Sequence, residues 1–121
     1  MILVDTSVWI DFLRTGEPHL TELLMRGQVL RHPWVQGELL LGRLDPQSEF
    51  SRLMGELPCA DSASHAEMIG LIQAESLGGT GIGYVDAQLI ASARLTRNTR
   101  VWTRDKRLSA VCDRMGIGFR P

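Results

Sequence analysis

MILVDTSVWIDFL, residues 1–13, is the stretch that decides the fold. Its apolar run Ile2–Val4 is too short for a helix, and a polar Asp-Thr-Ser sequence follows it. Apolar residues then recur at helical spacing, at Val8, Trp9, Phe12 and Leu13. This pattern predicts a buried strand that leads directly into a helix. Asp5 would then lie at the carboxyl edge of an open α/β sheet, where ligands bind. Asp5 or Thr6 could also serve only as the helix N-cap, so both interpretations stay open.

The bulk composition is that of one globular domain. The chain has 121 residues, 44% of them hydrophobic, which predicts a single domain spanning residues 1–121. No apolar run approaches the roughly 18 residues of a membrane span, and the N-terminus has no secretory signal pattern. Cys59 and Cys112 lie far apart, with no histidine at ligand spacing. They predict small buried thiols in a reduced, cytoplasmic protein rather than a disulfide or zinc site.

Basic residues are concentrated in one segment of the chain. The formal net charge of -1 does not by itself indicate a nucleic-acid-binding protein. In the segment 94–107, however, Asp105 is the only acid among the basic residues Arg94, Arg97, Arg100, Arg104, Lys106 and Arg107. Such a cluster can bind phosphates, although a solvated helix face is the common alternative.

Strand and helix patterns alternate along the rest of the chain. Further strands are expected at 28–31, 58–60, 100–103 and 116–119. The expected helices are 34–44, one that starts at Asp45-Pro46 with Asp45 as its cap, 64–77 with Asp61 as its cap, a buried helix 84–96, and 105–115. This alternation predicts an α/β fold with a parallel sheet that is covered on both faces.

Three more acids stand out by their positions. Glu38 lies in an otherwise apolar helix, on the same face as Trp34 and Leu41, where an unpaired charge would be costly. Asp86 lies in the first turn of the expected buried helix, and Asp105 directly follows an expected strand. With the acid that ends the first strand, they make four acids in structurally unusual places.

Each of these acids also has a local explanation. Asp86 could complement a helix dipole, Asp105 could cap a helix, and Glu38 could pair with Arg43 or Arg100. These local explanations are independent of one another. One convergent site at the carboxyl edge of the sheet explains all four acids together.

A cluster of carboxylates favours one kind of chemistry. Neighbouring carboxylates repel each other and cannot all ionise near neutral pH without a cation. Mg²⁺ or Mn²⁺, as one or two ions, suits a set of oxygen ligands without histidine or cysteine. Such a centre is well suited to phosphodiester hydrolysis, and the basic residues beside Asp105 would hold the polyanionic substrate. The sequence therefore predicts a metal-dependent nuclease.

Four blocks of the sequence resemble a known family. The blocks are ILVDTSVWIDFLR, HPWVQGELLLG, YVDAQLIASAR and VWTRD. In content, order and spacing they are similar to the PIN-domain nucleases, and specifically to the VapC-type toxins of bacterial toxin–antitoxin pairs. The resemblance implies a five-stranded parallel sheet flanked by helices on both faces. It also implies a Mg²⁺- or Mn²⁺-dependent endoribonuclease that forms a homodimer and is inhibited by a small cognate VapB-type antitoxin covering the acidic cleft.

The resemblance also assigns roles to individual residues. The catalytic and metal-binding acids of the family fall on Asp5, Glu38, Asp86 and Asp105. The supporting hydroxyl of the family falls on Thr103, and Thr6 directly follows the first acid. Independently of the resemblance, the basic residues that flank Asp105 are expected to contact RNA; they are Arg104, Lys106 and Arg107. In the family a metal-bound water would attack phosphorus in line and leave a 5′-phosphate and a 3′-hydroxyl.

Some polar residues are expected to lie outside the site. Asp11 shares a helix face with Ser7 and Arg14 and is interpreted as solvated or structural. The scattered histidines have no ligand spacing and are interpreted as surface or hydrogen-bonded residues; they are His19, His32 and His65.

Two other functions are alternatives to the nuclease. A receiver-type signalling domain would use Asp5 in a metal pocket and Asp61 as phosphoacceptor, but it needs a second acid beside Asp5. It also needs a lysine after its last long strand, and the only lysine, Lys106, follows an aspartate instead. A catalytically silent PIN-like scaffold that binds RNA or a partner is the closer alternative, and the presence of all four acids favours the enzyme.

Overall fold

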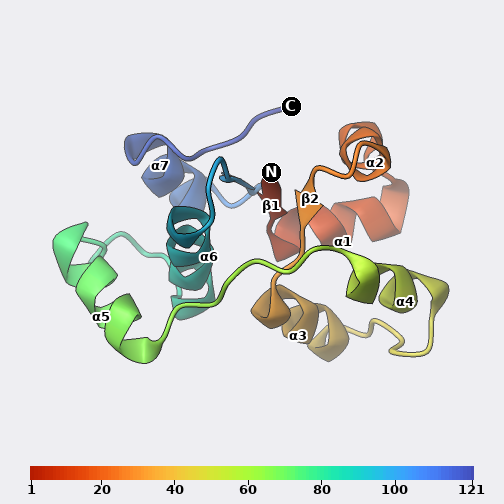
Figure 1. Cartoon of the computed structure of the whole chain (residues 1–121), viewed down its shortest axis with the longest axis horizontal. Helices are drawn as coiled ribbons and strands as arrows, with labels where there is room; N and C mark the ends of the chain where they lie inside the picture. Colours follow the sequence, from red (N-terminus) through yellow and green to blue (C-terminus); the bar gives the residue numbers. More distant parts are fainter.

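The computed structural model describes residues 1–121 and has an α/β architecture (Figure 1). In chain order the elements are β1 (Ile2–Val4), α1 (Thr6–Thr15), α2 (Pro18–Met25), β2 (Val29–Leu30), α3 (Pro33–Leu41), α4 (Glu49–Glu56), α5 (His65–Ala74), α6 (Tyr84–Leu95), β3 (Arg100–Trp102) and α7 (Lys106–Arg114).

β1 is the central strand of a parallel sheet with the order β2-β1-β3. Leu3 is paired with Leu30 on one side and with Val101 on the other. All three are buried, as the short apolar runs predicted. Because parallel strands end at the same edge, the residues that follow β1 and β3 lie side by side. The backbone N–H of Asp5 donates to the carbonyl oxygen of Trp102, 2.9 Å away.

The sheet has three strands, so the prediction of five was wrong in number. The outer two positions are single parallel bridges, Arg31 with Cys59 and Val101 with Gly118. Each bridge has two backbone hydrogen bonds of 2.8–2.9 Å and does not extend. On one side Pro58 has no N–H to continue the ladder, and on the other Gly118 adds no side chain to pack. The order of the five segments is still that of a parallel sheet.

One expected helix start and one expected helix cap lie elsewhere. α4 begins after Ser48 rather than at Asp45, whose side chain closes a turn by accepting from the backbone N–H of Gln47 at 2.9 Å. α5 begins after Ser64 rather than being capped by Asp61, because Ser64 and the glutamate three residues later form a capping box. In both cases a serine directly before the helix is the better cap.

The helices lie on both sides of the strands. Figure 1 shows α5, α6 and α7 on one side and α1, α2 and α4 on the other. α6 is the most buried helix, with every residue from Ala87 to Ala93 buried, as its alanine-rich sequence predicted. None of the helices combines the length and apolarity that crossing a bilayer requires.

Both cysteines are free thiols, but only one of them is buried. Cys112 lies in the core, while Cys59 is exposed. The prediction of two buried thiols is therefore wrong for Cys59, which lies in the weakly paired edge segment of the sheet.

Candidate active site at the carboxyl edge of the sheet

Asp5 is buried where β1 passes into α1, with only 5% of its surface exposed. Its Oδ1 accepts from the backbone N–H of Thr6 at 2.7 Å, so it is the N-cap of α1. Its Oδ2 accepts from the hydroxyls of Ser7 at 2.8 Å and Thr103 at 2.6 Å. These donors offset the cost of burying a carboxylate. Asp5 therefore has two structural roles. It caps α1, and through Thr103 it links the end of β1 to the end of β3.

The hydroxyls of Ser7 and Thr103 join the junction that follows β3 to the one that follows β1. The Ser7 Oγ accepts from the backbone N–H of Arg104, and the Thr103 Oγ1 accepts from that of Asp105, both at 3.0 Å. Thr103 was expected to support the site, and Ser7 was missed. A hydroxyl two residues after an acid at a strand-to-helix junction was the signal that could have identified it.

Glu38 reaches the same edge from α3. Its Oε1 accepts from the hydroxyl of Thr6 at 2.7 Å, so Thr6 contacts Asp5 through its backbone and Glu38 through its side chain. No ion pair joins Glu38 to Arg43 or Arg100, so that local explanation of Glu38 is wrong.

The environment of Glu38 also differs from the sequence prediction. Glu38 is exposed, and its helix neighbours Trp34 and Leu41 are 41% and 90% exposed. α3 buries only Val35 and Leu39. The face that carries Glu38 is therefore largely open to solvent.

Asp86 links the acids electrostatically. It is half-buried in the first turn of α6, where its Oδ2 accepts from the backbone N–H of Gly83 at 2.9 Å. Burial raises the pKa of the Asp86 carboxyl, and the charges of Asp5, Asp105 and Glu38 raise it further, while the hydrogen bond from Gly83 acts in the opposite direction. The structure thus brings the other three predicted acids within electrostatic reach of Asp86.

Asp105 is the most exposed of the three aspartates in the cluster. It is the N-cap of α7 and accepts from the backbone N–H of Leu108 at 2.9 Å. The capping explanation is therefore confirmed for Asp105. The charge of Asp105 also raises the pKa of Asp86, so this capping residue belongs to the acidic cluster as well.

The chemistry of this cluster fits a hard divalent cation. The side chains that meet here offer only carboxylate and hydroxyl oxygens, which Mg²⁺ and Mn²⁺ prefer. A cation would relieve the repulsion that raises the pKa of Asp86. No three of the Asp, Glu, His or Cys side chains already converge as ligands, because each acid accepts from its own nearby donor. Glu38 and Asp105 are exposed, which leaves their carboxylates room to reorient toward an ion.

The three predicted RNA-contacting cations have different surroundings. Arg104 is already paired, with its Nε 2.7 Å from Asp11 and its Nη2 on Glu17. Asp11 is thus structural, as expected. Lys106 and Arg107 are exposed and form no ion pair. Together with Thr80, Ala110, Val111 and Arg114 they line a hollow of about 420 Å³.

His32 joins the helices that carry Glu38 and Asp86. It is completely buried and caps α3, with its Nδ1 accepting from the backbone N–H of Trp34 at 3.1 Å. Its Nε2 lies 2.9 Å from the hydroxyl of Ser92 in α6. Burial lowers the pKa of His32 to about 4, so the ring is neutral at pH 7 and its Nε2–H donates to Ser92. The expectation of a hydrogen-bonded histidine is confirmed.

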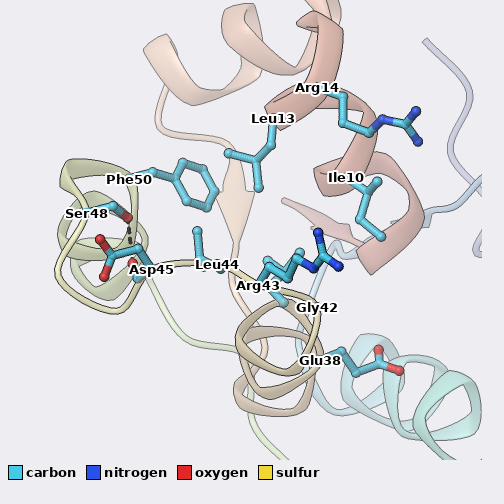
Figure 2. A pocket seen from close by; sticks show the side chains of 11 residues that line it. Ile10, Leu13, Arg14, Glu38, Gly42, Arg43, Leu44, Asp45, Ser48 and Phe50 are labelled. Carbon is cyan, nitrogen blue, oxygen red and sulfur yellow. Dashed lines mark hydrogen bonds between the residues drawn. The ribbon is translucent and has the colours of Figure 1, made fainter.

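An apolar pocket lies beside the acidic cluster, between α1, α3 and α4 (Figure 2). Its volume is about 440 Å³. Figure 2 shows Glu38 at one margin and Phe50 and Ser48 at the opposite one. Ile10 and Leu13 line it and are 41% and 42% exposed, which is unusual for two large apolar residues on one helix.

Both the sequence and the fold of this chain have known relatives. Residues 2–114 match the model of the PIN domain. The chain is a member of the PIN-domain family. Within it, the chain is 42% identical over 119 residues to Ribonuclease VapC32 of two Mycobacterium tuberculosis strains, across 98% of this chain and 96% of the relative. This PIN-domain chain is therefore of the VapC type.

Solved structures share the PIN-domain fold at lower identity. FitAcB from Neisseria gonorrhoeae matches with a TM-score of 0.66 and 22% identity, over 93% of this chain and 94% of that one. FitAB bound to an IR36 DNA fragment matches with a TM-score of 0.64 and 22% identity, over 93% and 91%. At this identity the likeness establishes the fold alone.

Proposed function

We propose that this chain is the endoribonuclease toxin of a toxin–antitoxin module and that it hydrolyses RNA with the help of Mg²⁺ or Mn²⁺. The observation that carries the proposal is the half-buried Asp86, whose pKa is raised by burial and by three other carboxylates. A cluster of like charges of this kind is expected at a functional site. The similarity to Ribonuclease VapC32 over nearly the whole chain supports RNA as the substrate.

Asp5, Glu38, Asp86 and Asp105 would hold one or two metal ions. When bound, the ions would supply positive charge to the scissile phosphate and lower the pKa of the attacking water. Thr103 and Ser7 keep the Asp5 carboxylate in place by donating to its Oδ2, and Thr6 positions Glu38 in the same way. These hydroxyls fix the acids before substrate arrives, so less ordering is needed during the reaction.

The RNA backbone would be held mainly by Lys106 and Arg107. Both are exposed and free of ion pairs, and both lie in the first turn of α7, directly after Asp105. Arg104 contributes less in this proposal, because Asp11 and Glu17 already neutralise it. The RNA strand would then approach the carboxylates from the α7 side.

A small VapB-type antitoxin would occupy the pocket between α1, α3 and α4. Ile10, Leu13 and Phe50 offer it an apolar surface, and an exposed apolar patch of this kind is typical of a protein–protein contact. A basic antitoxin side chain could reach Glu38 at the pocket margin and cover the acids. We further propose that the chain acts in the cytoplasm as a homodimer.

Cleavage of total RNA by the purified, antitoxin-free chain tests the proposal. The reaction is run with Mg²⁺, with Mn²⁺, with a chelator, and with Asp5→Asn and Asp61→Asn proteins in parallel. Asp61 is an exposed aspartate with no ion pair, so it is the matched control. We expect discrete fragments with 5′-phosphates that require metal, persist in Asp61→Asn and disappear in Asp5→Asn. Folded wild-type protein that binds RNA but never cleaves it would instead indicate a binding scaffold.

A further inference from the structure

Arg107, in the first turn of α7, rests against the loop that joins α5 to α6. Its side chain is exposed and forms no ion pair. The contact is with Gly81 of the loop. A methyl group added at Gly81 would lie 2.8 Å from Cδ of Arg107, 3.1 Å from its Nε and 3.2 Å from its Nη1. The outer half of the Arg107 side chain therefore occupies the space that any side chain at residue 81 would need.

The loop beneath Arg107 is anchored on both sides of Gly81. Before Gly81, Leu77 is buried, and the hydroxyl of Thr80 donates to the Leu77 carbonyl oxygen at 2.6 Å. After Gly81, the side chain of Ile82 packs against the hydrophobic core. The surface that supports Arg107 is therefore fixed to the body of the domain.

The same loop connects Arg107 to the acidic cluster. Two residues after Gly81, the backbone N–H of Gly83 donates to Oδ2 of Asp86 at 2.9 Å. Two residues of chain span at most about 7 Å, so the loop surface under Arg107 lies close to this carboxylate. Arg107 is therefore a cation near the acidic cluster that forms no ion pair with it, and its charge is available to a ligand.

The surroundings of Arg107 indicate an anionic ligand. The hollow that Arg107 lines also contains the cations Lys106 and Arg114, and no acidic residue lines it. The Nη2 of Arg114 donates to the backbone carbonyl oxygen of Glu75 at 2.7 Å, which fixes this second guanidinium. A planar guanidinium whose orientation is fixed can bind a phosphate through two parallel hydrogen bonds. A backbone phosphate of RNA bound at the acidic cluster has the charge and shape that this surface fits.

A second glycine of the loop separates the contact with Arg107 from the needs of the backbone. Gly79 and Gly81 have φ angles of 81° and 84°, in the left-handed region that favours glycine. No atom lies within 4 Å of the place where a methyl group on Gly79 would be, whereas Arg107 fills that place at Gly81. Backbone conformation alone therefore explains Gly79, but Gly81 has an additional neighbour.

We propose that Gly81 is a positioning residue for RNA binding. Because Gly81 has no side chain, Arg107 can lie against the loop and hold a backbone phosphate of the RNA bound at the acidic cluster. The inference rests on the proposed function, in which Arg107 contacts the RNA backbone, and it gives the glycine loop before α6 a role in that contact. A phosphate contact carries no sequence information, so the effect should be the same for RNA strands of different sequence.

The test measures binding of a fluorescent oligouridine by anisotropy at a series of salt concentrations, with a chelator present to prevent cleavage. Arg107→Ala and Gly81→Ala should each weaken binding about 10-fold at low salt. Each should also reduce the slope of the salt dependence by about one ion. The double variant should bind no more weakly than Arg107→Ala alone, because both changes remove the same contact.

Gly79→Ala is the matched control. It introduces the same backbone strain without touching Arg107, so oligouridine binding and its salt dependence should be unchanged. The end of the Arg107 side chain can move into solvent, so Gly81→Ala should lose no more stability than Gly79→Ala in urea titrations. A loss of affinity in Gly81→Ala with equal stability in the two variants would therefore report on the position of Arg107.

Four results would overturn the positioning role. They are unchanged binding in Gly81→Ala, equal losses of binding in Gly79→Ala and Gly81→Ala, a further loss when Gly81→Ala is added to Arg107→Ala, and no oligouridine binding by the wild-type chain. If the wild-type chain binds the oligouridine but never cleaves RNA when metal is supplied, the proposed function fails while this comparison of binding remains intact.

Discussion

The two ends of α3 are built differently, although they flank the same carboxylate. At the N-terminal end, the buried His32 is hydrogen-bonded to Ser92 of α6. Two residues later, the partly exposed ring of Trp34 packs beside Tyr84, also in α6. At the C-terminal end the neighbouring surface is an open pocket lined by Leu13, other apolar residues and polar side chains that include Arg14 and Arg43. The N-terminal end is therefore held firmly against α6. An apolar, open end suits an adaptable segment of a partner protein.

Glu38 lies between these ends and lines the pocket while contacting Thr6 at the acidic cluster. The difference between the two ends therefore suggests how inhibition and catalysis share one helix. A partner held by the C-terminal end can reach the carboxylates without covering the N-terminal end. Changes at either end should then separate stability from antitoxin binding.

The largest effect is expected at the rigid end, from His32→Leu. This change removes the cap of α3 and leaves the buried hydroxyl of Ser92 without its partner. A lost cap costs about 1 kcal/mol and an unsatisfied buried group about 1–3 kcal/mol, so the free energy of unfolding should fall by about 3 kcal/mol in urea titrations. Ser92→Ala should cost less, and the double variant less than the sum. A neutral His32→Leu would show that this end is not held by the histidine.

The pH dependence of the free energy of unfolding also tests the buried His32. The folded-state pKa of His32 is about 4, below the unfolded value of about 6.5. The unfolded chain therefore binds more protons between these values, and stability must fall as the pH drops through this window. The wild type should lose more stability from pH 7 to pH 4 than His32→Gln, in matched urea titrations. Parallel curves for the two proteins would contradict the neutral, buried histidine.

The next effect is expected at the apolar end, from Leu13→Gln. Loss of a buried leucine contact costs about 2 kcal/mol, so antitoxin affinity should fall about 30-fold in calorimetric titrations, with RNA cleavage unchanged. Leu95→Gln, at a similarly exposed leucine of α6, serves as the control. Equal losses in both variants would show that the pocket is not the antitoxin site.

Glu38→Gln is expected to have a smaller effect, but on both RNA cleavage and antitoxin binding. The amide removes one charge from the acidic cluster while keeping the shape of the side chain. Metal-dependent cleavage should fall at least about 10-fold, and antitoxin affinity should fall a few-fold. If cleavage persists at the wild-type rate, α3 contributes no catalytic residue.

The smallest effect is expected away from α3, from Arg104→Gln. This residue forms an exposed charge network with Asp11 and Glu17, and such networks contribute about 1 kcal/mol or less. RNA affinity should change less than it does in Lys106→Gln or Arg107→Gln proteins, as measured by anisotropy at low salt. A larger loss for Arg104 than for either neighbour would mean that substrate releases it from its acidic partners.

Much of the site could be predicted because local sequence determined it. Asp5, Asp86 and Asp105 each lie at the start of a helix, and strand ends in a parallel sheet must meet at one edge. The burial of α6 followed from its alanine-rich sequence in the same way. These features depend on periodicity and capping, which are readable over a few residues.

The remaining features depend on contacts between distant residues. The exposure of the Glu38 face could not be predicted. An apolar helix has the same sequence pattern whether the surface that covers it belongs to the same chain or to another one. The two expected outer strands are only single bridges, at Cys59 and Gly118. The length of a strand ladder depends on its pairing with neighbouring strands rather than on composition. The roles of Ser7 and His32 emerged only when residues far apart in sequence were brought together.

The most direct test of the central claim is Mn²⁺ binding to the metal-free chain by calorimetry. Asp5, Glu38, Asp86 and Asp105 are replaced one at a time by the corresponding amides, with Asp61→Asn as the control. If the four carboxylates form one cation site, wild-type and Asp61→Asn proteins bind Mn²⁺ equally, and the four amide variants of folded protein bind it at least about 10-fold more weakly. Wild-type affinity in the four variants, or an equal loss in Asp61→Asn, would contradict the account.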